Sequence, residues 1–266
     1  LKSGVEAAIG AEFPIHRDSI KVNGTIPATD SVAEINSLVN SYPGVSVFKV
    51  KAGSGIEADI KRLKAVKGVA PSAKIRIDVN GSWSVAEAER NIKAIVDQIG
   101  ALEYVEQPVS DFESLQELKP KLNGEVLIAG DEVIRKSQDL MKLDLLSAID
   151  ILMFKVSPLG GINRSLKLAA HHKLPVVVSS ALESVVGISY GLKLASQLPE
   201  LNYACGLATG ALMKEDLGVI AINDGAMSVN PIEISREMLE KLKVSPERLE
   251  WWRNRITEVW GLRGAM

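Results

Sequence analysis

Ionisable or hydroxyl residues end six strand-like segments of this chain at nearly even intervals. Successive members of the set are about 24 to 28 residues apart, the length of one strand, one helix and two loops in an α/β barrel. Charged side chains at strand ends are costly unless they meet a metal, a substrate or each other. The spacing therefore predicts one active site built by successive strands from Lys51, Asp78, Glu106, Asp131, Lys155 and Ser180.

Three carboxylates of this set, those of Asp78, Glu106 and Asp131, would come from three neighbouring strands. Hard oxygen ligands of this kind suit Mg²⁺, with Mn²⁺ as a substitute, and leave positions for water and substrate oxygens. No histidine or cysteine lies near these acids in the sequence, which argues against zinc. We therefore predict that Asp78, Glu106 and Asp131 bind magnesium.

Two lysines, Lys51 and Lys155, lie on opposite sides of the three acids by strand order. A substrate carboxylate bound to the metal would hold its α-carbon between them, and the cation would stabilise the enolate left by α-proton removal. A lysine base near pH 7 needs a lowered pKa. We expect Lys49, on the same strand face as Lys51, to supply like charge that lowers it.

Strand-like and helix-like segments alternate along the chain. The predicted strands are 19–26, 45–51, 74–80, 102–106, 126–129, 148–155, 175–179 and 202–205. The predicted helices are 31–41, 56–69, 84–99, 112–122, 137–146, 163–172 and 182–197, with N-cap signals at Asp30 or Ser31, Ser84, Asp111 and Ser137. This alternation implies parallel strands, and eight of them favour a closed barrel. The alternative is a doubly wound sheet, but no G-x-G-x-x-G fingerprint follows an early strand.

Side-chain alternation along two of the strands separates an apolar set from a polar set. The apolar set, expected to face the outer helices, is Phe48, Val50, Ile75, Ile77 and Val79. The polar set, expected to face the barrel interior near its C-terminal mouth, is Lys49, Lys51, Arg76, Asp78 and Asn80. The barrel prediction thus also predicts where the chemistry lies.

Composition restricts the classes of partner. The chain has 266 residues, of which 46% are hydrophobic and 24% charged, and its formal net charge is −2. This charge predicts no nucleic-acid or anionic-membrane partner, and no apolar run is long enough for a membrane span. The single cysteine, Cys205, excludes an internal disulfide and favours a reducing, cytoplasmic location. We expect a small-molecule carboxylate substrate, and the oligomeric state stays open, with a monomer among the options.

Five short motifs, in this order, resemble those of the enolase superfamily, in its muconate-lactonising subgroup. They are K-x-K at 49–51, D-V-N-G at 78–81, E-Q-P at 106–108, G-D-E at 130–132 and the lysine of FKVSPLGG at 155. Each motif alone also fits an ordinary strand end or turn, but five at barrel spacing favour a site. The segments VNGTIPA, SSALES and PERLEWWRNR are similar to the actinobacterial branch of the o-succinylbenzoate synthases of menaquinone biosynthesis.

The resemblance covers nearly the whole chain and implies a domain organisation. It implies an α/β, TIM-type (β/α)7β-like barrel over residues 19–230, with a C-terminal helical segment, 231–266, packing on the barrel. Such chains normally carry an N-terminal α+β capping domain that closes over the barrel mouth. Here residues 1–18 would be only a connecting remnant of it, so we expect the capping domain to be largely absent from this chain.

The resemblance also implies roles for individual residues. Lys51 would take the α-proton of a cyclohexadiene carboxylate and return a proton to the departing hydroxyl, in a Mg²⁺-dependent syn dehydration to 2-succinylbenzoate. Lys155 would stabilise the enolate from the opposite face. Supporting residues that orient ligands or lysines would be Lys49, Asn80, Gln107 and Glu132. Contacts to the substrate carboxylate or succinyl tail would come from Ser179, Ser180, Gly160 and Gly161.

Two alternatives remain open at this stage. The same residues would serve an N-succinylamino acid racemase or dipeptide epimerase, in which both lysines exchange the α-proton. A non-catalytic barrel that binds a ligand or a protein partner is the alternative from another class, since a barrel without its cap has an open mouth.

Overall fold

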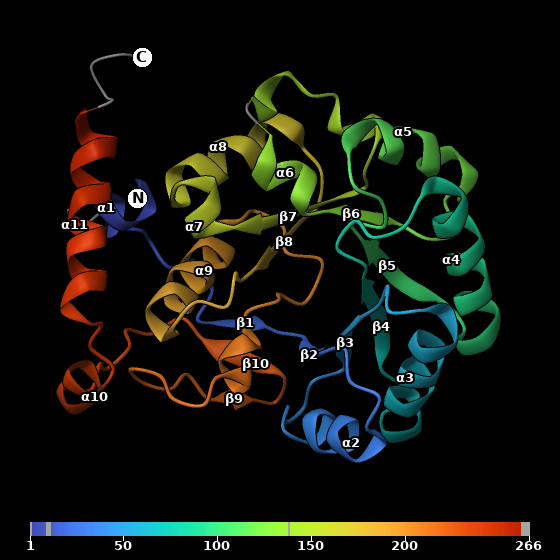
Figure 1. Ribbon diagram of the computed structural model, residues 1–266, viewed down its shortest axis with the longest axis horizontal. Helices are drawn as coiled ribbons and strands as arrows, with labels where there is room; N and C mark the ends of the chain where they lie inside the picture. The colour runs from blue at the N-terminus through green and yellow to red at the C-terminus, as the bar shows by residue number, and fades with distance from the viewer. Residues whose placement is uncertain (1, 9–11, 138, 262–266) are drawn as a thin grey trace.

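A curled parallel sheet is the centre of the computed structural model, which describes residues 2–8, 12–137 and 139–261. Within these residues seven parallel strands pair in chain order, and helices surround them (Figure 1). The strands are β2 (Gly24–Ile26), β3 (Val47–Lys51), β4 (Lys74–Asp78), β5 (Leu102–Glu106), β6 (Ile128–Gly130), β7 (Ile151–Lys155) and β8 (Val176–Ser179). The predicted α/β barrel is confirmed, and the C-terminal ends of the strands meet at one mouth.

Six of the predicted helices are confirmed to within three residues at either end. They are α2 (Val32–Asn40), α3 (Ile56–Val69), α4 (Val85–Ile99), α5 (Phe112–Lys121), α8 (Ile162–His172) and α9 (Val185–Gln197). Side chains of Ser31, Ser84 and Asp111 cap α2, α4 and α5 as predicted. Their agreement with the sequence follows from caps and apolar periodicity acting together.

The helix predicted at 137–146 is wrong. This stretch forms two 3₁₀ turns, Leu140–Lys142 and Leu145–Ser147, and the helix of this unit, α6 (Glu132–Lys136), begins directly after Asp131. Asp139 and Asp144 precede the two turns. Aspartate favours helix starts over helix interiors, so two of them five residues apart break the segment into short turns.

The barrel closes without the eighth strand predicted at 202–205. Instead Cys205 bridges Val22, and the next residue, Gly206, bridges Ser179 at the end of β8. Because the partner changes from one side to the other after a single residue, no ladder forms on either side. The strand predicted at 19–26 is divided at this bridge into β1 (Ser19–Lys21) and β2.

A small antiparallel sheet, not predicted from the sequence, lies beside the barrel. It has the order β1, β10 (Ala226–Ser228), β9 (Ile222–Asn223). Asp224 and Gly225, with φ of 47° and 71°, connect β9 to β10. An Asp-Gly pair with positive φ at both residues is typical of a two-residue hairpin turn, so the sequence did contain a signal for this hairpin.

The barrel strands separate two buried clusters, as the predicted alternation requires. The outward-facing residues Phe48, Val50, Ile75 and Ile77 belong to the main core shared with the helices. A second cluster lies inside the barrel and comprises Tyr104, Ala129, Ile151, Met153 and Val177. Side chains that follow this inner cluster along their strands therefore point to the mouth.

The cap of α4 gives a first testable prediction. The Ser84 side chain accepts a hydrogen bond from the Glu87 backbone N–H, and the Glu87 carboxylate accepts one from the Ser84 N–H. Replacing Ser84 by alanine should therefore lower the free energy of unfolding by about 1 kcal/mol. Urea unfolding of the Ser84→Ala variant measures this, and an unchanged midpoint would contradict the role of the cap.

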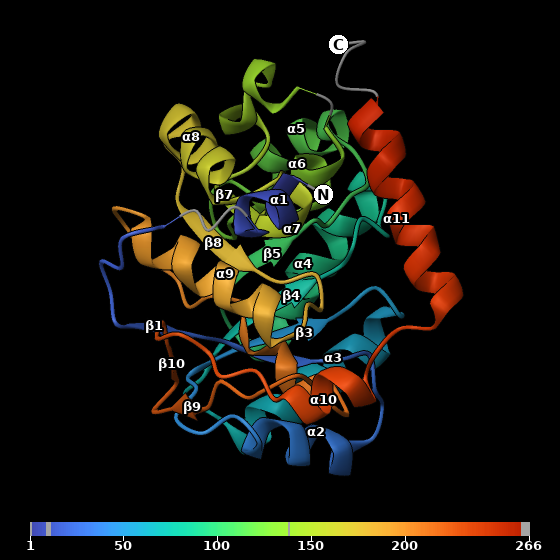
Figure 2. The same cartoon turned by 90° about the vertical axis from the view of Figure 1, so that its left-hand side faces the viewer.

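Three of the helices in the described ranges lie outside the barrel ring: α1 (Lys2–Ala8), α10 (Arg236–Lys241) and α11 (Pro246–Gly261). Helix α11 stands at the edge of the molecule (Figures 1 and 2). Trp251 and Trp252 on this helix are 47% and 46% exposed, so the packing on the barrel that we predicted for the C-terminal segment is not seen for them. Over the described ranges, every helix is too short or too polar to cross a membrane.

Candidate active site

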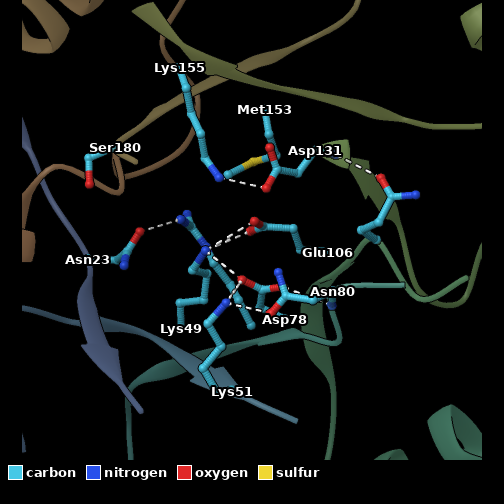
Figure 3. A network of polar contacts seen from close by, with 12 residues as sticks. Asn23, Lys49, Lys51, Asp78, Asn80, Glu106, Asp131, Met153, Lys155 and Ser180 are labelled. Atoms are coloured by element: carbon cyan, nitrogen blue, oxygen red, sulfur yellow. Dashed lines mark hydrogen bonds and ion pairs between the residues drawn. The ribbon is translucent and has the colours of Figure 1, made fainter. Parts of the chain in front are cut away.

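The predicted site residues meet at the C-terminal mouth of the barrel (Figure 3). Strand register aligns Lys51 with Asp78 and Asp78 with Glu106, so these side chains share the inner face of β3, β4 and β5. Asp131 follows β6, and Lys155 ends β7. The parallel sheet thus places five residues from five successive strands around one space.

Ion pairs link these residues. Lys49 Nζ lies 3.0 Å from both Asp78 Oδ2 and Glu106 Oε1, and Lys51 Nζ lies 2.6 Å from Asp78 Oδ2. On the other side, Lys155 Nζ lies 2.6 Å from Asp131 Oδ2. The two predicted catalytic lysines therefore lie on β3 and β7, with the carboxylates between them.

Burial and neighbouring charges shift the pKa values of Lys49, Asp78 and Glu106. Burial favours the neutral form of Lys49, but the carboxylates of Glu106 and Asp78 outweigh it and raise the Lys49 pKa, so Lys49 stays a cation. Burial also acts on Asp78, where the charges of Lys49 and Lys51 prevail and lower its pKa to about 2. Burial and the Asp78 carboxylate raise the pKa of Glu106 to about 7. The acids lie close enough to repel one another.

Gln107 and Asn80 hold the acids in place from positions with left-handed backbone, φ 39° and 52°. The Gln107 side-chain oxygen, Oε1, accepts hydrogen bonds from the backbone N–H groups of Asp131 (3.0 Å) and Val133 (3.1 Å). The Asn80 amide donates to Glu132 Oε1 at 3.2 Å and accepts from Lys51 Nζ at 2.7 Å. Asn80 therefore contacts Lys51, and Gln107 contacts the backbone of Asp131. Among the described residues, Glu132 instead forms hydrogen bonds with Asn80 and Arg135 and with no predicted metal ligand or lysine.

Removing the Gln107 side-chain amide should destabilise the backbone from Asp131 to Val133. In a Gln107→Leu variant, the buried N–H groups of Asp131 and Val133 lose their acceptor, which costs about 1–3 kcal/mol for each unsatisfied group. We expect a lower free energy of unfolding, measured in urea, together with weaker binding of Mg²⁺. A variant as stable as the parent would show that these N–H groups find other partners.

The donors present fit a hard divalent cation, although the acids are paired with lysines in this structure. Among the described residues, no three His, Cys, Asp or Glu side chains come close enough together to form a metal-binding group. However, Asp131 Oδ1 is buried and has no hydrogen-bond partner in the part of the chain that the structure describes. Arg135 Nε lies 3.7 Å from this oxygen, beyond hydrogen-bond distance. A buried carboxylate oxygen without a hydrogen bond, beside two further acids, is what a metal cation would compensate.

The two predicted substrate serines lie differently. Ser179 is aligned with Lys155 and has the parity of the inner residue Val177, so its side chain faces the barrel interior. The Ser180 hydroxyl lies 2.6 Å from that of Thr209. The strand-end residue in register with Lys155 is therefore Ser179, whereas Ser180, which we placed in the evenly spaced set, follows the strand.

Gly160 and Gly161 lie where α7 (Val156–Leu159) meets α8. The Glu6 carboxylate of α1 accepts hydrogen bonds there from the backbone N–H groups of Ile162 (2.6 Å) and Asn163 (3.1 Å). A side chain at Gly161 would collide with Glu6. This contact gives the glycine a structural reason, and its substrate role stays a prediction.

Sequence reasoning missed Asn23 and Thr209 and gave Arg76 no role. Asn23 accepts from Arg76 Nη1 at 3.0 Å inside the barrel. Side-chain alternation had placed Arg76 on the inner face of its strand, and this was the sequence signal that could have pointed to a role for it. Asn23 lies between β1 and β2, and Thr209 lies in a short 3₁₀ helix, Ala208–Leu212, so strand periodicity gives no information on either.

Comparisons with known proteins agree with this geometry. Residues 31–231 match the family model described as enolase C-terminal domain-like. An o-succinylbenzoate synthase of Mycobacterium tuberculosis (strain ATCC 25618 / H37Rv) is 40% identical, over 98% of this chain and 80% of its own length.

Among solved structures, an N-succinyl Arg/Lys racemase from Bacillus cereus ATCC 14579 superimposes with a TM-score of 0.75 at 24% identity, over 88% of this chain. A muconate cycloisomerase from Pseudomonas fluorescens gives a TM-score of 0.73 at 23% identity, over 89% of this chain. The chain spans 65% and 68% of these two chains, and at such identity the likeness concerns the fold.

Proposed function

Because this chain belongs to the enolase C-terminal domain-like family, we propose that it catalyses the dehydration of 2-succinyl-6-hydroxy-2,4-cyclohexadiene-1-carboxylate to 2-succinylbenzoate. The observation that carries the proposal is the position of Lys51 and Lys155 on β3 and β7, with Asp78, Glu106 and Asp131 between them. The 40% identity to an o-succinylbenzoate synthase supports this choice of reaction.

In the proposed reaction Lys51 acts as both base and acid. Its neutral amine takes the proton from the α-carbon of the substrate carboxylate, and the C–H electron pair passes into the enolate. The resulting ammonium then protonates the departing hydroxyl, which leaves as water while the aromatic ring forms. Lys51 ends neutral again, so one residue on one face completes a syn elimination.

Lys155 and the acids have separate parts. The Lys155 ammonium lies on the side of the site opposite Lys51 and stabilises the negative charge that develops on the substrate. Asp78, Glu106 and Asp131 would hold Mg²⁺, which supplies Lewis-acid stabilisation of a carboxylate that becomes an enolate. Lys49, which is buried and cationic, forms ion pairs with both Asp78 and Glu106.

A spectrophotometric assay tests the proposal. The purified protein, supplied with the cyclohexadiene substrate and Mg²⁺, should consume the diene absorbance and release 2-succinylbenzoate, identified by mass spectrometry, and EDTA should stop the reaction. A folded protein that binds Mg²⁺ but yields no 2-succinylbenzoate would exclude this function.

A second function fits the same two lysines. With one lysine on either side of the α-carbon, proton removal by one and return by the other would racemise or epimerise an N-succinylamino acid. Incubation of N-succinyl amino acids in D₂O separates the reactions. Deuterium at the α-carbon with inversion, without dehydration activity on the cyclohexadiene, would favour this alternative.

A further inference from the structure

Between β8 and β2 the barrel is joined by four backbone hydrogen bonds in place of a strand ladder. Cys205 donates to Lys21 O (2.8 Å) and accepts from Asn23 N–H (2.9 Å). Gly206 donates to Val178 O (2.8 Å) and accepts from Ser180 N–H (3.1 Å). We call residues 203–206 the closing segment. Its last residue is bonded on both sides of Ser179, the hydroxyl in register with Lys155.

Arg76 reaches this segment from β4, through the barrel interior. Its side chain is completely buried, with Nε 2.6 Å from Glu103 Oε2. Nη1 donates to Ala204 O of the closing segment at 2.8 Å and to Asn23 Oδ1, directly before β2, at 3.0 Å. The guanidinium lies 4.6 Å from the ring centroid of Tyr104 and 6.0 Å from that of Tyr203. Three of these contacts are to the closing segment or to Asn23, directly before β2.

We infer that Arg76 is a positioning residue, which holds the closing segment in the gap between β8 and β2 and thereby fixes Ser179 beside Lys155. Charged hydrogen bonds from a rigid guanidinium are stronger than the neutral backbone bonds they supplement. Because Gly206 is bonded to both neighbours of Ser179, displacement of the segment would move that hydroxyl. The effect on substrate rests on the proposed function, whereas the effect on the segment does not.

Cys205 is a built-in reporter of the segment. Its side chain is completely buried, and burial raises the pKa of its thiol to about 11. A thiol reagent such as 5,5′-dithiobis(2-nitrobenzoate) can reach it only when the closing segment opens. As the single cysteine of the chain, it gives an unambiguous labelling rate.

The test compares two buried arginines. In Arg76→Met the labelling rate of Cys205 should rise about 10- to 100-fold, the factor expected for losing hydrogen bonds from a charged group. Arg62→Met is the matched control. Arg62 is 2% exposed and pairs with Asp59 at 2.9 Å, but its backbone acceptors are Thr29 O and Lys51 O at the end of β3, away from the closing segment. The Arg62→Met variant should lose stability without the rise in the labelling rate of Cys205.

Kinetics give the second readout. In Arg76→Met we expect KM to rise about tenfold with kcat within about threefold, because substrate contact is lost before chemistry. Equal labelling rates in Arg76→Met and Arg62→Met would overturn the inference, whatever the activity. If Arg76→Met does not fold, Asn23→Ala decides instead. It removes one Nη1 acceptor and keeps the pair with Glu103, and unchanged labelling in it would also overturn the inference.

Discussion

Replacing Lys51 by alanine should lower kcat about 100- to 10,000-fold, the usual contribution of a positioned acid or base. Folding should be nearly unaffected, because the Lys51 side chain is 33% exposed and Asp78 keeps its contact with Lys49. Steady-state kinetics with saturating Mg²⁺ measure the loss, and urea unfolding checks the fold.

Two further variants make this result specific. Lys155→Ala should also lose kcat, whereas Lys93→Ala, at an exposed position of α4, should behave like the parent. If Lys51→Ala retains parental kcat on both the cyclohexadiene and N-succinyl amino acids, Lys51 is not the base, and the non-catalytic alternative gains.

Replacing Lys49 by alanine should lower the free energy of unfolding more than the other lysine substitutions proposed above. In Lys49→Ala two buried carboxylates, Asp78 and Glu106, lose the cation that bonds both of them, and an uncompensated buried pair typically costs about 3–5 kcal/mol. We expect the urea midpoint to fall accordingly and added Mg²⁺ to restore part of the loss.

The matched control is Lys74→Ala. Its ion pair with Glu103 lies at the surface, with the Lys74 side chain 68% exposed, so the expected cost is below about 1 kcal/mol. If Lys49→Ala and Lys74→Ala lose similar free energies of unfolding, the buried ion pairs of Lys49 do not stabilise the fold more than a surface ion pair does.

The strand-end residues were predictable because a parallel barrel repeats one simple rule. Inner-face parity and one polar residue per unit were sufficient to place Lys51, Asp78, Glu106, Asp131 and Lys155 at one mouth. Motif resemblance then gave Gln107 and Asn80 their supporting positions. These predictions depended on periodicity, which is a property of each strand by itself.

Contacts between distant segments could not be predicted in this way. The Glu6 carboxylate meets α8 across 156 residues, and Arg76 Nη1 meets Ala204 across 128. Neither partner has a sequence signal that names the other. The strand predicted at 202–205 overlaps the closing segment, but the pairing there changes sides between Cys205 and Gly206.

The central claim is that Asp78, Glu106 and Asp131 form one cation site between the two lysines. Thermal unfolding with increasing Mg²⁺ tests it, because a ligand that binds only the folded state raises the midpoint with concentration. The parent should show a concentration-dependent rise, and Glu106→Gln should lose it while remaining folded. An equal rise in both proteins, or none in the parent, would contradict the account.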